Sequence, residues 1–177
     1  MSTQQAIEAL QERFPHIRFA PEPMLVRPDG TTGGQFQVRV PAEALIDVLS
    51  FLLNDERCRF EQLCDLTCVD YLNFPGARDR FGVLYSLLSL THGHRLWVKC
   101  FVNDPDPELP SVTGLWKGAN WLEREVYDMF GIRFVGHPDL RRILTWEGFP
   151  AHPLRKDYPL RGRGERENYE IVTRESS

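Results

Sequence analysis

Residues 81–103, FGVLYSLLSLTHGHRLWVKCFVN, decide the fold of this chain of 177 residues. Two runs rich in apolar residues, 81–90 and 95–103, flank the short polar sequence THGH. Two such runs joined by a short polar turn are typical of an antiparallel hairpin. The stretch therefore predicts two neighbouring strands of one sheet.

The sequence before this hairpin alternates between helix and strand patterns. Residues 4–14 place apolar side chains on one helical face, and Thr3 is in position to cap that helix. After some short extended pieces, residues 35–40 alternate as a strand with one buried face does. A second helix is expected over 41–54, where Pro41 suits the first turn. Residues 62–72 (QLCDLTCVDYL) then predict a further strand.

One more helix is expected after the hairpin. Asn120 and Glu123 have the spacing of a capping box, and Gly131 suits the end of a helix that runs to about Phe130. The order is helix, two strands, helix, three strands, helix and extended tail. This order predicts an α+β two-layer domain with helices on one face of a mixed sheet.

These patterns divide the chain into three parts. Residues 1–118 are expected to form the α+β domain, and 119–160 an interface helix with an extended docking segment. The last part, 161–177, contains no core residues and predicts a C-terminal tail that is mobile in the free chain.

Composition excludes some classes of protein. The formal net charge is −4 and the pI about 5.7, which argues against a nucleic-acid partner because such partners select a basic face. No signal peptide is visible, and no apolar run reaches the roughly 18 residues that span a bilayer. We therefore expect an intracellular protein that meets the membrane only through a partner.

The sequence of 121–158, WLEREVYDMFGIRFVGHPDLRRILTWEGFPAHPLRKDY, has a different character. It interleaves Arg and Glu with Trp, Tyr and Phe, and shows no sustained apolar period after Gly131. Arg and aromatic residues are enriched at protein–protein interfaces. The stretch therefore predicts a surface that another protein covers, and a solvated, ion-paired tail is the alternative.

Single residues give little sign of catalytic or metal chemistry. Glu125 and Asp128 share a helical face, but carboxylates near a helix N-terminus are also explained by the helix dipole. His137 and His152, each followed by Pro, have no third ligand at metal-site spacing. No nucleophile or nucleotide-loop motif occurs. The four cysteines fit buried structural thiols better than a zinc or iron–sulfur site: Cys58, Cys64, Cys68 and Cys100.

The stretch also resembles a known family. EREVYDMF at 123–130, His137 after six residues, Arg141 after three more, and then Ile143-Leu144 match a motif of the 30-kDa subunit of respiratory complex I. In bacteria this family is known as the C subunit of NADH-quinone oxidoreductase. GANW before the motif and HPLRKDYPL after it fit as well, although Ala151 stands where Gly is expected.

The resemblance implies a non-catalytic assembly subunit in the peripheral arm of a proton-translocating NADH:quinone oxidoreductase. It implies docking onto the 49-kDa-type large subunit near the quinone site, on the cytoplasmic side of the bacterial inner membrane. The chain itself is expected to have no catalytic, metal or cofactor-binding residue. NADH, FMN, iron–sulfur clusters and quinone are expected in the whole complex.

On this interpretation the motif residues form the partner interface, with Arg and carboxylate groups pairing across it and aromatic side chains anchoring the helix. We expect Arg124→Ala to weaken assembly and to leave the isolated fold intact. The predicted interface residues are Trp121, Glu123, Arg124, Glu125, Tyr127, Asp128, Phe130, His137, Arg141, Arg142, His152, Arg155, Lys156 and Asp157.

Three alternatives stay open at this point. The chain could be the equivalent subunit of a related membrane-bound hydrogenase or plastid-type complex. It could be a stand-alone metalloenzyme that uses His137, His152 and a nearby acid. It could also be an adaptor in an unrelated complex.

Overall fold

The computed structural model describes residues 2–165, which form an α+β domain around a five-stranded sheet of order β1-β2-β5-β4-β3. The strands of this sheet are β1 (Glu22–Pro23), β2 (Phe36–Arg39), β3 (Gln62–Asp70), β4 (Phe81–Ser89) and β5 (His94–Val102). The helices are α1 (Thr3–Arg13), α2 (Leu45–Asn54), which a 3-10 turn at Ala42–Ala44 precedes, and α3 (Ala119–Phe130). Two short strands, β6 (Glu108–Pro110) and β7 (Arg133–Val135), pair in parallel beside α3.

The predicted hairpin forms the centre of the sheet. β4 and β5 pair antiparallel from Phe81 opposite Val102 to Ser89 opposite His94. β3 pairs antiparallel with the other edge of β4, and β2 pairs in parallel with β5. The predicted mixed sheet is therefore confirmed. β4 is almost entirely buried, since it has a strand on each side and helices above it.

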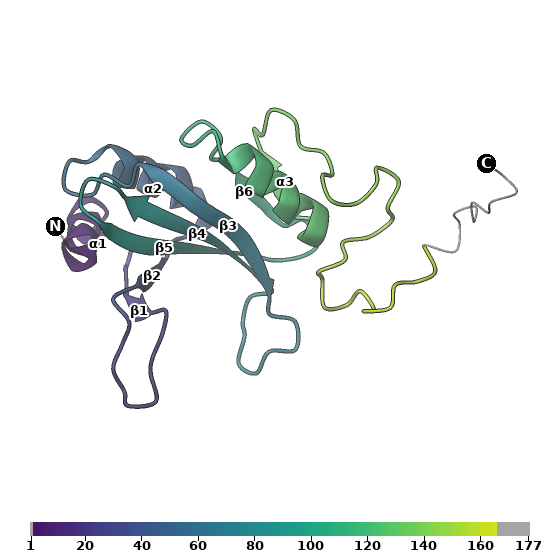
Figure 1. Ribbon diagram of the computed structural model, residues 1–177, viewed down its shortest axis with the longest axis horizontal. Coiled ribbons are helices and arrows are strands. Elements are labelled where there is room, and N and C mark those ends of the chain that lie inside the picture. Colours follow the sequence, from purple (N-terminus) through teal and green to yellow (C-terminus); the bar gives the residue numbers. More distant parts are fainter. Residues whose placement is uncertain (1, 166–177) are drawn as a thin grey trace, which may run out of the picture.

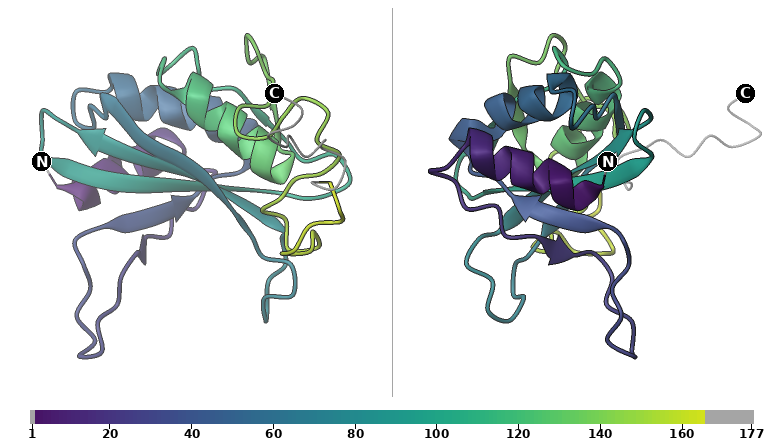
Figure 2. Two further views of the ribbon diagram at one scale, coloured as in Figure 1. Left: turned by 45° about the vertical axis from the view of Figure 1, so that its right-hand side comes forward. Right: turned by 90° about the vertical axis from the view of Figure 1, so that its left-hand side faces the viewer.

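The three helices lie on the same face of the sheet, as predicted (Figure 1, Figure 2). On that face, alternate residues of β4 are fully buried against the helices: Phe81, Val83, Tyr85 and Leu87. The other face has no helix among the described residues, and the β1–β2 and β3–β4 loops project from that side (Figure 1). The core is thus one-sided, because the apolar helical faces cover only one side of the strands.

The N-terminal helix is capped one residue earlier than predicted. Ser2, not Thr3, is the N-cap: its Oγ accepts from the Gln5 backbone N at 3.4 Å, and Gln5 Oε1 accepts from the Ser2 backbone N at 2.9 Å. This reciprocal box needs Glu or Gln three positions after the cap, and only Ser2 has one. Thr3 lies inside the helix and donates from Oγ1 to the Arg95 carbonyl at 3.1 Å.

The capping box predicted for α3 is wrong. The helix begins after Gly118, and no side chain caps it. Asn120 and Glu123 lie within the helix, where the Glu123 carboxylate faces a neighbouring loop instead of the helix start. The predicted end of the helix is confirmed, since Gly131 is the C-cap with φ of 76°. β7 follows at once, although its residues showed no strand pattern in the sequence.

The four cysteines are free thiols. Cys58, Cys68 and Cys100 are buried and Cys64 is half-buried. Burial raises the pKa of Cys58 and of Cys100 to about 12. Among residues 2–165, no helix has the length and apolar character needed to cross a membrane. Of the predicted tail 161–177, residues 166–177 lie outside the described range.

Candidate functional site

Helix α3 and the segment that follows β7 form the candidate site, and we call residues 137–160 the strap. The strap contains no helix or strand, yet it runs back along α3 (Figure 2). One face of α3 is apolar and joins the core through Val126, Met129 and Phe130. The buried polar side chains of α3 are Glu123, Arg124 and Asp128, and most of their hydrogen bonds go to the strap.

Asp128 is the main attachment point of the strap. Its fully buried carboxylate accepts backbone N–H groups from Ile143, Leu144 and Thr145 at 3.0, 2.8 and 2.8 Å. It also accepts from Arg142 Nη1 at 2.7 Å and from the Thr145 hydroxyl. Burial alone would raise the pKa of Asp128, but these hydrogen bonds outweigh burial and hold the pKa well below its usual value.

Arg124 holds the preceding residues from the same helix. Its Nε donates to the Arg141 carbonyl at 3.0 Å and its Nη2 to the Arg142 carbonyl at 3.1 Å. The guanidinium also lies over the Trp121 ring, 5.2 Å from its centroid. Arg124 is buried, so its guanidinium bonds to the strap and is not free to bind solvent or a partner.

The C-terminal end of α3 is closed by the second half of the strap. The last carbonyls of a helix have no partner within the helix. Here His152 Nδ1 donates to the Asp128 carbonyl at 2.9 Å, Leu154 N to Met129 at 3.1 Å, and Arg155 Nε to Phe130 at 2.6 Å. Burial lowers the pKa of His152, which favours its neutral ring.

Gly131 allows this close approach. A Cβ atom there would lie 2.6 Å from His152 Nε2, nearer than side chains normally pack. The φ of 76° is also one that glycine adopts without strain. The same residue therefore ends the helix and admits the strap.

The strap is finally tied to the sheet. The Lys156 backbone N donates to Asp70 Oδ2 at 2.9 Å, at the end of β3. Arg80, at the start of β4, pairs with Asp70 at 3.3 Å, with Asp157 at 2.8 Å and with Asp104. No local pattern indicates this cluster, because its members come from widely separated parts of the chain.

Glu123 has a different role at the other end of α3. Its buried carboxylate accepts the Val112 backbone N at 2.6 Å and the Ser111 hydroxyl at 2.7 Å. Burial raises the pKa of Glu123 to about 7, against the opposite effect of these two hydrogen bonds. His137 Nε2 lies 4.0 Å from the carboxylate and donates to the Asn120 carbonyl at 3.1 Å.

The predicted interface residues therefore fall into three groups, which are buried, half-buried and exposed. Glu123, Arg124 and Asp128 are buried and bonded within the chain, so the expectation that they pair with a partner is corrected to an internal role. Phe130 is buried in the core, and a half-buried set lies between α3 and the strap: Tyr127, His137, Arg142, His152 and Arg155. The exposed set is Trp121, Glu125, Arg141, Lys156 and Asp157.

The outer surface formed by the strap and the neighbouring Trp121 of α3 is unexpectedly apolar. Trp121 is 61% exposed and Leu144 63%, and Trp146, Leu154 and Leu160 are exposed as well. A hollow of about 680 Å³ lies among Leu144, Trp146, Phe149, Pro153, Tyr158 and Leu160. Trp121 was among the predicted interface residues, but sequence reasoning missed Leu144, Trp146, Leu154 and Leu160. An isolated Leu or Trp in a segment without periodicity gives no signal of exposure. We call Trp121, Leu144, Trp146, Leu154 and Leu160 the apolar set.

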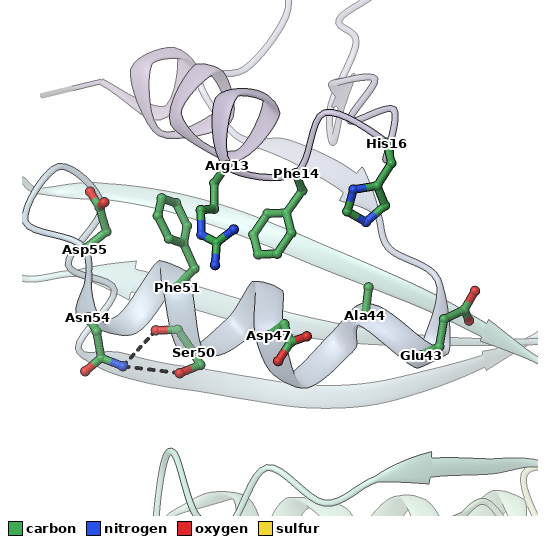
Figure 3. A pocket seen from close by; sticks show the side chains of 10 residues that line it. All are labelled: Arg13, Phe14, His16, Glu43, Ala44, Asp47, Ser50, Phe51, Asn54 and Asp55. Atoms are coloured by element: carbon green, nitrogen blue, oxygen red, sulfur yellow. Dashed lines mark hydrogen bonds between the residues drawn. The ribbon is translucent and has the colours of Figure 1, made fainter.

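A hollow of about 790 Å³ lies between α1 and α2, where Phe14 and Phe51 meet edge-on at 5.9 Å (Figure 3). Its polar side chains come from both sides: Arg13 and His16 extend from the end of α1 and the residues after it, and the others are spread along α2 and its ends (Figure 3). Asn54 bonds to Ser50 of its own helix. Nothing in this lining sets an acid, a base or a nucleophile against one another, so we assign it no chemistry.

The two histidines of the metalloenzyme alternative are held apart. His137 bonds to the carbonyl of Asn120 and His152 to that of Asp128, eight residues further along α3. Eight residues of helix correspond to about 12 Å along the axis. Within residues 2–165 no three His, Cys, Asp or Glu side chains gather as a metal site requires.

Comparison with known proteins identifies the class to which this fold belongs. Residues 38–164 match the family model described as the 30 Kd subunit of the respiratory-chain NADH dehydrogenase. The chain belongs to this family, and the resemblance found in the sequence is confirmed.

Individual relatives agree with the family. The chain is 52% identical over 129 residues to the NADH-quinone oxidoreductase C subunit of Caulobacter vibrioides, covering 73% of this chain and 64% of that protein. It is 46% identical over 155 residues to the same subunit of Sinorhizobium medicae, covering 88% and 75%. It is 48% identical to the mitochondrial NADH dehydrogenase iron-sulfur protein 3 of Candida albicans, covering 72% and 44%. The chain thus spans about half to two thirds of the length of several curated relatives.

Two solved structures share the fold. A trypsin-resistant fragment (1–134) of Nqo5 superposes with a TM-score of 0.62 at 37% identity, over 76% of this chain and 99% of the fragment. A chain from an archaeal membrane-bound sulfane sulfur reductase superposes with a TM-score of 0.69 at 22% identity, over 97% and 93%. The second likeness shows the fold alone.

Proposed function

We propose that this chain is a non-catalytic assembly subunit in the peripheral arm of a proton-translocating NADH:quinone oxidoreductase. The strap and its apolar set dock onto a large subunit of the 49-kDa type, close to the quinone site. NADH, FMN, the iron–sulfur clusters and the quinone are bound by other subunits. The arm lies on the cytoplasmic side of the bacterial inner membrane, and this chain meets the membrane only through its partners.

This proposal rests on the different roles of the charged and the apolar side chains around α3. The charged side chains of the motif are used inside the chain, where they hold the irregular backbone of the strap in place. The apolar set is left facing outward from the same segment. A rigid apolar surface with Trp and Leu at its centre is the kind of patch that a stable interface covers.

The test is a pull-down of the tagged full chain from gently solubilised membranes of a strain that lacks its own copy. We expect a 49-kDa-type subunit and NADH-linked quinone reductase activity to co-purify. Replacing Leu144 and Leu160 with Ser should reduce co-purification at least about tenfold, since each deletes an apolar anchor. Leu90→Ser is the matched control, because Leu90 is 65% exposed at the far turn of the β4–β5 hairpin.

A second candidate function differs only in the electron donor. The fold is shared with a chain of a respiratory membrane complex that is not an NADH dehydrogenase. Quinone or sulfur reduction driven by hydrogen or another donor, with no NADH-linked activity in the purified complex, would favour a hydrogenase-type or plastid-type relative. Recovery of the chain alone would overturn both candidates.

A further inference from the structure

A third hollow lies on the sheet face that has no helix among the described residues, away from the strap. It has a volume of about 320 Å³ and lies between β5, the end of β2 and the β3–β4 loop. Lys99, Tyr71, Phe74 and Phe101 line it, together with Arg39 and Arg78. We call this hollow the Lys99 pocket.

Lys99 is an unusual residue for an outer sheet face, since only 7% of it is exposed. Its Nζ donates to the Tyr71 hydroxyl at 2.6 Å and lies 4.8 and 5.1 Å from the ring centroids of Tyr71 and Phe101. An ammonium group has three N–H donors, and the described residues fill one of them. No carboxylate among residues 2–165 forms an ion pair with it.

Space for the lysine is made by a glycine. A Cβ at Gly82 would lie 2.9 Å from Lys99 Cε, 2.9 Å from the Tyr71 ring and 3.2 Å from the Phe101 ring. A side chain at this position would therefore displace the ammonium from its aromatic surroundings. The pocket is a packed arrangement and not a chance position of a flexible side chain.

The charge of the lining is positive in a chain whose net charge is −4. Its charged residues are Arg39, Arg78, Lys99 and Asp79, three cations against one carboxylate, or +2. Arg39 pairs with Glu22 at 2.9 Å, and Asp79 accepts from Asn103 Nδ2 at 2.9 Å. A buried ammonium without a carboxylate is costly, and an incoming anion would offset that cost.

The surroundings indicate a protein as the source of the anion. The β1–β2 and β3–β4 loops project on this side of the sheet (Figure 1). They expose large apolar side chains at Leu25, Val26 and Phe74. A free small anion would leave these apolar groups exposed to water, whereas a folded partner would cover them together with the pocket.

We propose that the Lys99 pocket binds an Asp or Glu side chain of a neighbouring subunit. The carboxylate completes the coordination of the Lys99 ammonium, and apolar residues beside it pack on Phe74. This second docking surface lies on the opposite side of the sheet from the helices. It rests on the proposed function only in requiring that the chain has subunit neighbours.

Lysine chemistry gives a direct test, because the chain has only three lysines: Lys99, Lys117 and Lys156. The intact complex is treated with a carbodiimide, which joins an amine to a contacting carboxylate without a spacer. We expect a cross-link from Lys99 to an Asp or Glu of another chain. Reductive methylation should label Lys99 in the free chain and about tenfold less in the complex, as protection by a bound partner requires. Exposed Lys117 is the internal reference.

Other outcomes separate the possibilities. Equal methylation of Lys99 in the free chain and the complex, without a cross-link, would overturn the proposal. Protection of Lys99 in the free chain by millimolar inorganic phosphate, again without a cross-link, would show a small-anion site instead. A chain recovered without partners would overturn the proposed function, whereas a complex that forms without the cross-link would overturn only this inference.

A variant adds an energetic readout. Lys99→Met removes the charge and keeps the length, so it should weaken retention of the chain in the salt-washed complex by about 10- to 100-fold. Lys117→Met should have no effect. If Lys99→Met lowers the melting temperature of the free chain and leaves retention unchanged, the ammonium serves internal packing alone.

Discussion

The sheet domain and the strap reach an ordered structure by opposite means. Phe81, Val83 and Leu87 in β4 are fully buried among other apolar side chains, and the helices pack directly on them. The strap has almost no apolar interior of its own, and carboxylates and guanidinium groups hold its backbone. An irregular segment can thus be fixed mainly by polar contacts when a neighbouring helix supplies them.

The two regions are not independent, because α3 serves both. Val126 and Met129 belong to the core, whereas Arg124 and Asp128 on the same helix bond to the strap. Unfolding the sheet must therefore release the strap, but releasing the strap need not unfold the sheet. The following variants are arranged to test this asymmetry.

The largest effect is expected from the sheet core. Leu87→Ala deletes a fully buried side chain, and we expect a loss of roughly 2–5 kcal/mol in the free energy of unfolding. Thermal melting should show one transition at lower temperature, with the strap lost together with the sheet. Leu90→Ala, at an exposed position just past β4, should change stability by less than about 0.5 kcal/mol. A strap that stays protected from hydrogen exchange while the sheet melts would contradict the dependence of the strap on the sheet.

Asp128→Asn should break the strap and spare the sheet. Asn keeps one acceptor oxygen but turns an N–H group toward the amides of residues 143–145, so we expect a local loss of about 2–4 kcal/mol. Hydrogen exchange of those amides and tryptic cleavage after Arg142 should accelerate, with β3–β5 unchanged. Asp139→Asn, at an exposed site, is the control. Equal loss of protection in the sheet would show that the strap is part of the core.

The low pKa of Asp128 adds a pH dependence. Because the folded pKa lies below the unfolded value of about 3.9, the contribution of Asp128 is complete above that value and declines as the pH falls through the folded pKa. Strap protection should therefore persist at about pH 5 and fail before the sheet in stronger acid. Hydrogen exchange of the backbone amides of residues 143–145 across this pH range would measure the loss of protection.

Arg124→Ala should have a smaller effect of the same kind. It removes two hydrogen bonds to strap carbonyls, and we expect about 1–3 kcal/mol of local destabilisation at residues 141–142. The sequence-based expectation of an intact isolated fold is thus revised to an intact sheet with a loosened strap. Arg141→Ala is the control, since among residues 2–165 its exposed side chain bonds only to Asp139. Exchange rates at 141–145 that match wild type would contradict this role.

Glu123 should give the smallest effect and a distinctive pH profile. Its folded pKa of about 7 lies above the unfolded value near 4.3, so the folded chain binds more protons between these values and loses stability as the pH rises. Glu123→Gln removes the charge and keeps an acceptor for Val112. We expect the free energy of unfolding of the Gln variant to exceed that of the Glu protein by about 1 kcal/mol at pH 8, and by less at pH 5. A difference that stays constant with pH would show that Glu123 does not titrate in this range.

The elements with strong local patterns could be predicted from the sequence. The hairpin, the α1 and α2 helices and the αL end of α3 at Gly131 depend on neighbours in sequence, and the structure confirms them. The residues that cap the helices were harder to predict. Thr3 was predicted to cap α1, but Ser2 caps it because Gln5 stands three positions after Ser2, a local pattern that the prediction overlooked. Asn120 matched a box whose Glu123 bonds instead to a loop eleven positions away. A tertiary contact decided only the second case.

The character of the site was predicted better than its details. The density of Arg, acids and aromatics correctly marked the stretch as unlike a core, but it could not show which charges face inward. Asp128 meets its partners 14 to 17 positions later, and Asp70 meets Lys156 across 86 positions. Pairings of this kind depend on how the strap folds back, which no local pattern encodes.

The parallel pairing of β2 with β5 has a consequence for the order in which the chain acquires structure. Phe36 finds its partner, Leu96, sixty positions later, whereas β3, β4 and β5 join through short connections. During synthesis, β2 can pair with the two-residue β1, but it cannot join the central sheet until β5 has left the ribosome. The antiparallel pairs, whose partners are close in sequence, are therefore expected to form first. Until then, the edge of β2 that pairs with β5 stays unpaired, and unpaired strand edges are the kind of surface through which a nascent chain aggregates.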